Sequence, residues 1–297
     1  MLYISNSNAR PKGSSSNRQL SSGIGYETSL LLARNQFTTY ATMRNFEKSK
    51  SIMEIANKEK LPLQVVLLDV NDDKSVKDAI YKIEKKQGRI DVAVNNAGYL
   101  LIGPVEELSI EEFKEQFETN FFGAIRVIKA VLPIMRKQRV GTIINISSIA
   151  GRIGLPLNSP YVSSKFALEG ISESIAYEVD PFGIKVVLIE PGVIKTNAAN
   201  SFKTGKKVAD NDINNSNSNP DTPYADITTK RIAALKSRFE DGLAPVEVAK
   251  VILKAARSEN PDLRYLVGDD AFKLMDMRNN THDKEFRKLI MENILRG

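Results

Sequence analysis

Two side chains with complementary proton chemistry lie four residues apart in the segment YVSSK. Tyr161 and Lys165 share one face of the helix that this segment predicts, because residues at that spacing are neighbours on a helix. A tyrosine with a pKa near ~10 is a poor acid or base at neutral pH, but a nearby ammonium favours the phenolate and lowers that pKa. Such a pair can donate a proton to a carbonyl or take one from an alcohol. Ser148 ends a predicted strand just before this helix, and its hydroxyl can hydrogen-bond the same oxygen.

The spacing alone is a weak signal, because the chain holds nine tyrosines and a second Tyr-x-x-x-Lys pair, Tyr81 and Lys85. The second pair lies mid-helix among charged neighbours, in a pattern typical of a solvated face. Tyr161 differs because it follows the strand that ends at Ser148. The argument for chemistry therefore depends on what surrounds each pair.

The elements that would position Tyr161 alternate between apolar runs and helical patterns. Strands are expected at 37–43, 63–70, 89–98, 141–148, 184–192 and 264–268, and helices at 26–35, 48–58, 73–87, 109–138 and 161–180. This order predicts a single-domain α/β fold with a doubly wound parallel sheet of about seven strands and right-handed crossovers.

Ligands of such sheets bind outside the carboxyl ends of the strands, so the residues there are candidates for binding. Each predicted strand end carries small, polar or charged residues directly after an apolar run. These residues are Met43, Arg44, Asp69, Val70, Asn95, Asn96, Ala97, Gly98, Ser147, Ser148 and the segment Pro191, Gly192, Val193 to Thr196.

Composition narrows the kinds of chemistry. The chain has 297 residues, 42% hydrophobic and 26% charged, with a net charge of +6 and no cysteine. Thiol catalysis and disulfides are excluded, and the single His282 cannot build a Ser-His-Asp triad or a histidine metal site alone. The basic residues form no concentrated stripe, so no nucleic-acid partner is expected. No apolar run is long enough to span a membrane and no signal-peptide core is present, so the chain is expected to be cytoplasmic.

The motifs occur in a fixed order at successive strand ends: NNAG at 95–98, SS at 147–148, Tyr161-x-x-x-Lys165 and PG at 191–192. This set resembles the short-chain dehydrogenase/reductase family, from about Ser21 to Gly268. The resemblance implies a Rossmann-type oxidoreductase domain that interconverts a ketone or aldehyde and an alcohol by hydride transfer to or from a nicotinamide cofactor.

The resemblance also assigns roles to single residues. Tyr161 would be the general acid/base, Lys165 would bind the nicotinamide ribose and lower the tyrosine pKa, and Ser148 would hold the substrate oxygen. Asn120 matches the family asparagine that kinks its helix and supports a water linked to the lysine. The cofactor would contact the residues Ser22, Gly23, Ile24, Gly25, Arg44, Asp69, Val70, Asn96, Ala97, Gly98, Tyr161, Lys165, Pro191, Gly192, Val193 and Thr196.

The end of the second predicted strand favours NADP(H) over NAD(H). In dinucleotide-binding folds an acid at this place binds the ribose 2′-hydroxyl, whereas an arginine accommodates a 2′-phosphate. This chain has Met43 and Arg44 there, with no acid before Glu47. Arg44 can make charge-assisted contacts with the phosphate, although a solvated arginine at a strand end is the alternative interpretation.

The first strand and its glycine turn depart from the family pattern. Ser22 to Gly25 matches the helix-start half of the Thr-Gly-x-x-x-Gly-x-Gly turn, with backbone N–H groups available to a pyrophosphate. The same alignment places Gln19 at the first glycine and Arg18 at the threonine, and PKGSSSN cannot be a buried central strand. Residues 1–20 are therefore treated as an atypical segment ahead of a domain at 21–297. Either residues 2–5, LYIS, supply the first strand before a polar insertion, or the strand is missing.

Several partner predictions complete the interpretation. Apolar loop residues favour a hydrophobic, steroid-, retinoid- or lipid-like substrate, although the same leucines can serve in packing: Tyr99, Leu100, Leu101, Leu155 and Leu157. Residues 197–245 are expected to form a substrate loop, in which the polar stretch 205–223 is a flexible loop or a lid. The resemblance implies a homodimer or homotetramer built on helices 109–138 and 161–180. The rival function is a catalytically impaired dinucleotide-binding or scaffold protein.

Overall fold

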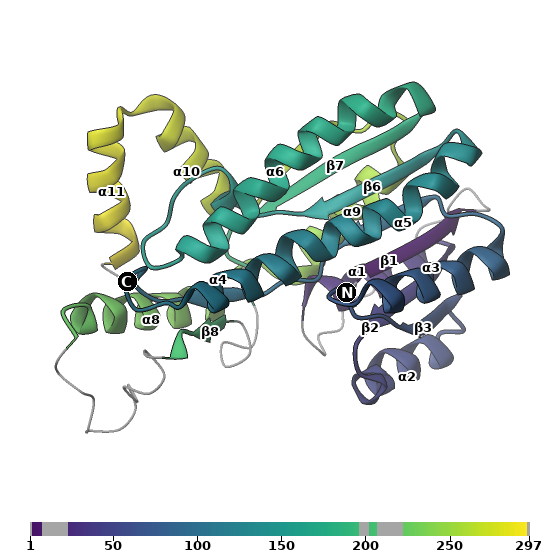
Figure 1. Ribbon diagram of the computed structural model, residues 1–297, viewed down its shortest axis with the longest axis horizontal. Coiled ribbons are helices and arrows are strands. Elements are labelled where there is room, and N and C mark those ends of the chain that lie inside the picture. The colour runs from purple at the N-terminus through teal and green to yellow at the C-terminus, as the bar shows by residue number, and fades with distance from the viewer. Residues whose placement is uncertain (1, 8–22, 196–201, 207–221, 296–297) are drawn as a thin grey trace.

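The computed structural model describes residues 2–7, 23–195, 202–206 and 222–295, and within them a seven-stranded sheet carries helices on both faces (Figure 1). The strand order is β3-β2-β1-β4-β6-β7-β9. The strands are β1 (Leu2–Ser7), β2 (Phe37–Met43), β3 (Leu63–Leu67), β4 (Val92–Asn95), β6 (Gly141–Ile146), β7 (Ile184–Pro191) and β9 (Arg264–Val267). The predicted doubly wound α/β architecture is confirmed.

Two apolar cores, one on each face of the sheet, account for the layers. Alternate side chains of a strand point to opposite faces, and so Val94 and Ile144 join one core while their neighbours Ala93 and Ile143 join the other. The first core is closed by α1 (Ile24–Arg34), α2 (Lys50–Lys58) and α9 (Pro245–Arg257), and the second by α3 (Asp73–Gln87), α5 (Gly123–Gln138) and α6 (Ser159–Val179). Strands buried on both faces explain the continuous apolar runs of the sequence.

The central strand β1 runs against the rest of the sheet. It pairs antiparallel with both β2 and β4, whereas every other neighbouring pair in the sheet is parallel. The LYIS segment therefore fills the position of the first strand, but the prediction of an all-parallel sheet is wrong at this strand. Leu2 lies opposite Asn95 at the carboxyl end of β4, and Ser7 lies opposite Phe37 at the start of β2. The direction of β1 is thus reversed relative to a strand that would lead directly into α1.

The long helix predicted at 109–138 is three consecutive pieces. These are α4 (Ile110–Phe117), a π-helical turn (Glu118–Phe122) and α5. Ser109 and Glu112 form a capping box that starts α4, because each side chain accepts from the other residue's backbone N–H. A π turn inside a helix often marks a functional site, and this one contains Asn120. The interruption agrees with the kink expected at that residue.

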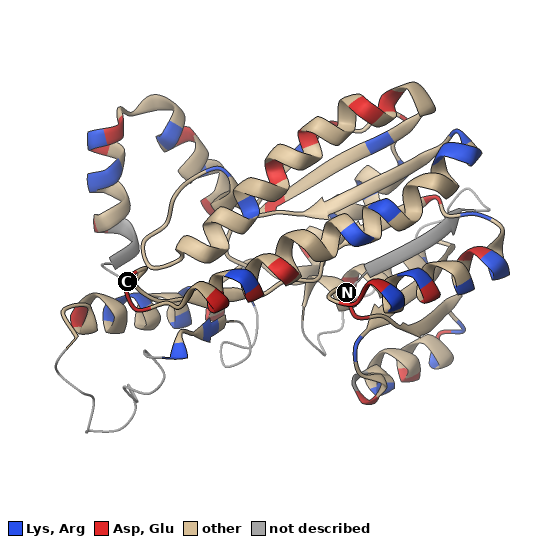
Figure 2. Ribbon diagram, in the orientation of Figure 1, with Lys and Arg blue, Asp and Glu red and all other residues tan. Residues whose placement is uncertain are grey.

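A smaller group of elements covers one end of the sheet. It contains the parallel pair β5 (Leu100–Ile102) and β8 (Phe202–Thr204), with α8 (Ala225–Glu240), α10 (Asp269–Asn280) and α11 (Asp283–Leu295) (Figure 1). Lys, Arg, Asp and Glu are interspersed along the outer helices, as Figure 2 shows. None of the helices in the described ranges is both long and apolar enough to cross a bilayer.

Candidate active site

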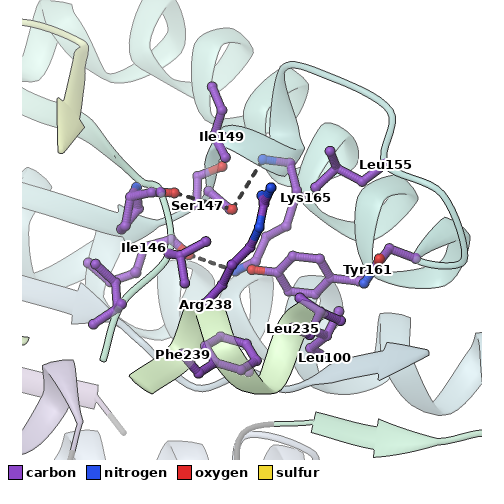
Figure 3. A pocket seen from close by; sticks show the side chains of 18 of the residues that line it. Leu100, Ile146, Ser147, Ile149, Leu155, Tyr161, Lys165, Leu235, Arg238 and Phe239 are labelled. Atoms are coloured by element: carbon purple, nitrogen blue, oxygen red, sulfur yellow. Dashed lines mark hydrogen bonds between the residues drawn. The ribbon is translucent and has the colours of Figure 1, made fainter. Parts of the chain in front are cut away.

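A cavity of about 310 Å³ lies at the carboxyl edge of the sheet, beside the start of α6 (Figure 3). We call it the Tyr161 cavity. Three of the four predicted catalytic residues, Ser148, Tyr161 and Lys165, line it. They arrive from two elements, since Ser148 follows β6 and the other two lie one turn apart on α6. The structure thus brings together the residues that the sequence analysis singled out.

Burial dominates the electrostatics of the tyrosine and the lysine. Lys165 is 5% exposed, its Nζ donates to the Ile146 carbonyl oxygen at 2.7 Å, and burial lowers its pKa to about 8. Burial raises the pKa of Tyr161, and a hydrogen bond with Ser148 partly opposes that rise. The Lys165 Nζ lies 5.6 Å from the centroid of the Tyr161 ring. Tyr161 is thus a protonated phenol at neutral pH, and the expected lowering of its pKa by Lys165 is not seen.

The Ser148 hydroxyl lies just beyond the carboxyl end of β6 and is fixed there by hydrogen bonds. It accepts from the Ala150 N–H at 3.1 Å and lies 3.4 Å from the Pro191 carbonyl oxygen, to which it donates. The long contact to Pro191 leaves the hydroxyl able to turn toward a substrate oxygen. The hydroxyl groups of Ser148 and Tyr161 therefore lie side by side at the cavity, within hydrogen-bond reach of each other.

Asn120 does not line the cavity, and its side chain braces the cavity wall. Its Oδ1 accepts from the Tyr99 N–H at 3.1 Å, and its Nδ2 donates to the Tyr99 carbonyl oxygen at 3.0 Å and to Ser164 Oγ at 3.2 Å. A Cβ on Gly98 would meet Asn120 Oδ1 at 3.2 Å, so a glycine there fits the close approach. The amide joins the π turn, the strand-end loop and α6.

Two buried carboxylates, each paired with a partly exposed arginine, lie next to the lysine. Glu169 follows Lys165 by one turn of α6, and Glu190 on β7 is fully buried. Arg264 contacts both carboxylates, at 3.0 Å to Glu169 and 3.4 Å to Glu190, and Arg152 contacts Glu190 at 3.0 Å. Burial, together with the charge of Glu169, raises the pKa of Glu190 to about 7. The negative charge of Glu169 acts on Lys165 in the direction that keeps it protonated.

A second cavity, of about 510 Å³, lies at the ends of β2 and β3, and we call it the Arg44 cavity. It contains Arg44, Val70 and Ala97 as predicted, and it shares Gly98 and Tyr99 with the Tyr161 cavity. The two cavities are therefore neighbours along the carboxyl edge of the sheet. Arg44 is exposed at this edge.

Asp69 is absent from both cavity linings among the described residues. Its Oδ1 accepts from the Asn71 N–H at 3.0 Å, within its own loop. The remaining predicted cofactor residues Asn96, Pro191, Gly192 and Val193 line the Tyr161 cavity.

The start of α1 fits an anion, as far as the described residues reach. Gly23 is the N-cap, with φ of 119°, a value that favours glycine. No side-chain hydrogen bond caps this helix within the described residues, and Ile24 lines the Tyr161 cavity. Gly25 is buried, and its carbonyl oxygen accepts from Ser29 Oγ at 3.1 Å. The predicted contacts Ser22 and Thr196, and the altered positions Arg18 and Gln19, lie outside the described residues.

Sequence reasoning missed the wall that α8 and α10 provide. This wall carries the residues Arg231, Leu235, Arg238, Phe239, Asp270 and Leu274. No motif marks them, because they follow the candidate binding segment 191–196 by 35 residues or more along the chain. The one available signal was the apolar spacing of α8. Of the expected apolar residues, Tyr99, Leu100 and Leu155 line the cavity, whereas Leu101 is buried and Leu157 packs against α8.

Comparisons with known proteins agree with this geometry. The family model described as short chain dehydrogenase matches residues 20–207. Retinol dehydrogenase 8 of Bos taurus is 40% identical over 82% of this chain and 78% of its own length. The 3-ketodihydrosphingosine reductase of Bacteroides thetaiotaomicron is 38% identical over 84% of this chain and 85% of its own. The solved structure "ElxO with NADP Bound" is 30% identical, with a TM-score of 0.67 over 85% of this chain and 95% of its own. The chain therefore belongs to the short-chain dehydrogenase/reductase family of oxidoreductases, which act on CH–OH groups.

Proposed function

We propose that this protein is an NADP(H)-dependent oxidoreductase that interconverts a hydrophobic ketone or aldehyde and its alcohol, with Tyr161 as general acid/base. The observation that carries the proposal is the convergence of Ser148, Tyr161 and Lys165 on one cavity. The tyrosine and the serine supply two hydrogen-bond donors for one substrate oxygen. The lysine supplies a buried positive charge behind them.

The protein's own residues account for the proton movements. In the reductive direction Tyr161 donates its phenolic proton to the substrate oxygen while Ser148 hydrogen-bonds the same atom. Because burial raises the pKa of Tyr161, the phenol is protonated at neutral pH and ready to donate. The Lys165 ammonium then stabilises the phenolate that remains. Bound nicotinamide, held by residues at the strand ends, would supply or accept the hydride.

The preference for NADP(H) depends on Arg44. A guanidinium at the edge of the Arg44 cavity can pair with a ribose 2′-phosphate, and no acid from the end of β2 lines that cavity. The NADP-bound structural neighbour supports the same preference. An Arg44→Asp variant is expected to raise the KM for NADPH at least about tenfold, consistent with loss of a charge-assisted contact, and to change the KM for NADH far less. A parallel rise for both cofactors would contradict the preference.

The proposed substrate is lipid-like. Leucines and aromatic rings line the Tyr161 cavity, and two similar proteins are named for retinol and 3-ketodihydrosphingosine. We further propose that 197–245 acts as the substrate loop of a single domain at 21–297, because α8 covers the cavity. A cytoplasmic location and a homodimer or homotetramer built on α4–α5 and α6 remain predictions from the sequence.

A second candidate, a dinucleotide-binding protein with impaired catalysis, is favoured by one observation. The reversed β1 does not lead from the carboxyl edge into α1, as a strand before a glycine-rich turn would. Titration of NADPH by fluorescence separates the candidates when it is combined with turnover of aliphatic ketones. Micromolar binding with turnover supports the oxidoreductase, and absence of binding at millimolar cofactor contradicts both.

The tyrosine assignment has a matched control within the chain. Tyr161→Phe is expected to lower kcat by at least about a hundredfold, because general acid catalysis contributes roughly 10² to 10⁴ in rate. Tyr81→Phe removes the hydroxyl of the other Tyr-x-x-x-Lys pair, whose ring is 61% exposed on α3, and should leave kcat unchanged. Equal activity of the two variants would refute the mechanism.

A further inference from the structure

The wall of the Tyr161 cavity that α8 supplies contains a buried positive charge. Arg231 is 3% exposed and lines the cavity. Its Nε and Nη2 both donate to Asn158 Oδ1, at 3.3 and 3.0 Å. Within the described ranges no carboxylate forms an ion pair with Arg231. The amide oxygen of Asn158 accepts hydrogen bonds from two N–H groups of Arg231 but, being neutral, does not compensate the positive charge of the guanidinium.

The surroundings of Arg231 increase the cost of that charge. Burial, together with the positive charge of Arg238, which lines the same cavity, lowers the pKa of Arg231 to about 10. The guanidinium still carries its proton at neutral pH. Asn158 precedes the first turn of α6, where the helix dipole adds a partial positive charge. A buried charge is costly unless a partner of opposite charge compensates it.

The hydrogen bonds from Arg231 on α8 to Asn158 at the start of α6 do not by themselves explain why this residue is an arginine. A neutral glutamine could donate one hydrogen bond to Asn158 Oδ1 without the cost of a buried charge. The cavity does contain one carboxylate, Asp270, but its Oδ2 accepts from the Val193 N–H at 2.7 Å. Among the described residues, no acid contributes to the pKa of Arg231. The described part of the cavity therefore provides no anion for Arg231.

The rest of the α8 wall is apolar. Leu235 and Phe239 follow Arg231 at intervals of four residues, so the three lie on one face of the helix and line the same cavity. Figure 3 shows Leu235, Phe239 and Arg238 rising from α8 on the side of the cavity that faces Tyr161. One face of α8 thus presents two apolar side chains and a guanidinium to the cavity.

We propose that the substrate of this site carries an anionic group, a carboxylate in a lipid-like molecule, which pairs with Arg231 while the carbonyl or alcohol carbon faces Tyr161. The inference rests on the proposed function and narrows its substrate to oxo or hydroxy fatty acids and compounds of similar chemistry. A planar guanidinium can donate two parallel hydrogen bonds to a carboxylate, which fixes the orientation of the substrate as well as its position. Arg231 is then a residue that determines substrate specificity.

The experiment compares an acid with its ester. Oxodecanoates in which the keto group moves stepwise away from the carboxylate, their methyl esters and a neutral aliphatic ketone are assayed with NADPH. The wild-type enzyme is expected to prefer at least one acid over its ester by about tenfold or more in kcat/KM. Arg231→Met should lower that preference at least about tenfold, because hydrogen bonds to charged groups contribute roughly tenfold to a hundredfold in affinity. Arg231→Lys should retain part of it.

The matched control removes the same charge from the outer face of the same helix. Lys236 is exposed and lines neither cavity, so Lys236→Met should leave the preference for the acid unchanged. An equal loss in both variants would overturn the proposal, because it would reflect the net charge of the protein. The unfolding temperature of Arg231→Met, expected at or above that of the wild type, shows that the variant is folded.

The remaining outcomes separate this inference from the proposed function. If the wild type reduces the neutral ketone and treats acids and esters alike, the anion site is wrong and the oxidoreductase stands. If Arg231→Met raises the KM for NADPH equally with acid and ester, the guanidinium serves a cofactor phosphate and the proposal is overturned. If no carbonyl compound is reduced, the proposed function itself has failed.

Discussion

Replacing Glu190 by glutamine should stabilise the protein at alkaline pH and have almost no effect on stability at acid pH. Glu190 is fully buried and its folded-state pKa is about 7, above the ordinary value of 4.5. A carboxyl whose pKa is raised by folding is favoured in its neutral form, so its ionisation opposes folding. That penalty is absent well below pH 4.5, grows between the two pKa values and is complete above about pH 7.

The magnitude follows from the two pKa values of Glu190. At about 1.36 kcal/mol for each pKa unit, the penalty is well under about 1 kcal/mol at pH 4 and about 3 kcal/mol at pH 8. With an unfolding entropy of about 2.1 cal/mol/K per residue, 3 kcal/mol corresponds to an unfolding temperature about 5 °C higher for a chain of this length. Glutamine resembles the protonated side chain, since its NH₂ can donate to Glu169 as the carboxyl proton does.

Differential scanning calorimetry at pH 4 and pH 8 measures the difference directly. Glu173→Gln is the control, because Glu173 also pairs with Arg264 but is 45% exposed. Pairs at such exposure contribute about 1 kcal/mol or less. A Glu190→Gln protein that is less stable than the wild type at pH 8, or stabilised equally at both pH values, would refute the reasoning.

Two further predictions concern the same edge of the sheet. Glu169→Gln removes the negative charge that helps keep Lys165 protonated, so the pKa of Lys165 should fall below about 8. The alkaline limb of the kcat/KM profile for reduction should therefore move to lower pH. An unchanged alkaline limb would show that the protonation of Lys165 does not determine its position. Gly192→Ala should destabilise the protein by about 1–3 kcal/mol and raise the KM for cofactor, because its Cβ would lie 2.1 Å from Asp270 Oδ1. Gly170→Ala, in open space on α6, should instead stabilise by about 1 kcal/mol in urea unfolding, and similar losses in both would contradict the packing argument.

The parts of the site that depend on local spacing could be predicted from the sequence. Tyr161 and Lys165 are four residues apart on a helix, and Ser148 directly follows an apolar strand, so helix and strand geometry alone place them at one edge. The pKa of Tyr161 could not be predicted in the same way. The sequence shows the nearby ammonium but not the burial, which shifts the pKa in the opposite direction.

Residues that reach the site only through tertiary packing could not be predicted from the sequence either, because their neighbours in space are far away along the chain. Arg231 and Asp270 come from helices far along the chain and carry no motif, and only the fold brings them to the cavity. The pairing of Glu169 with Glu190 depends on the contact of α6 with β7. The direction of β1 could not be predicted either, because a short apolar run such as LYIS is equally compatible with either strand direction.

The reversed strand has a consequence for folding and for handling of the protein. In the described sheet, β2 and β3 are joined to β4, β6, β7 and β9 through hydrogen bonds to β1 alone. The six-residue strand β1 therefore connects two groups of strands, β2–β3 on one side and β4, β6, β7 and β9 on the other. The hydrogen bonds of β2 and β4 along this side of each strand cannot form before β1 is in place. Removing residues 2–7 should therefore destabilise the whole sheet, because the two groups of strands also share the apolar cores on both faces. Since Leu2 lies at the carboxyl edge beside Asn95, a tag fused ahead of it would emerge at the edge of the sheet where the two cavities lie.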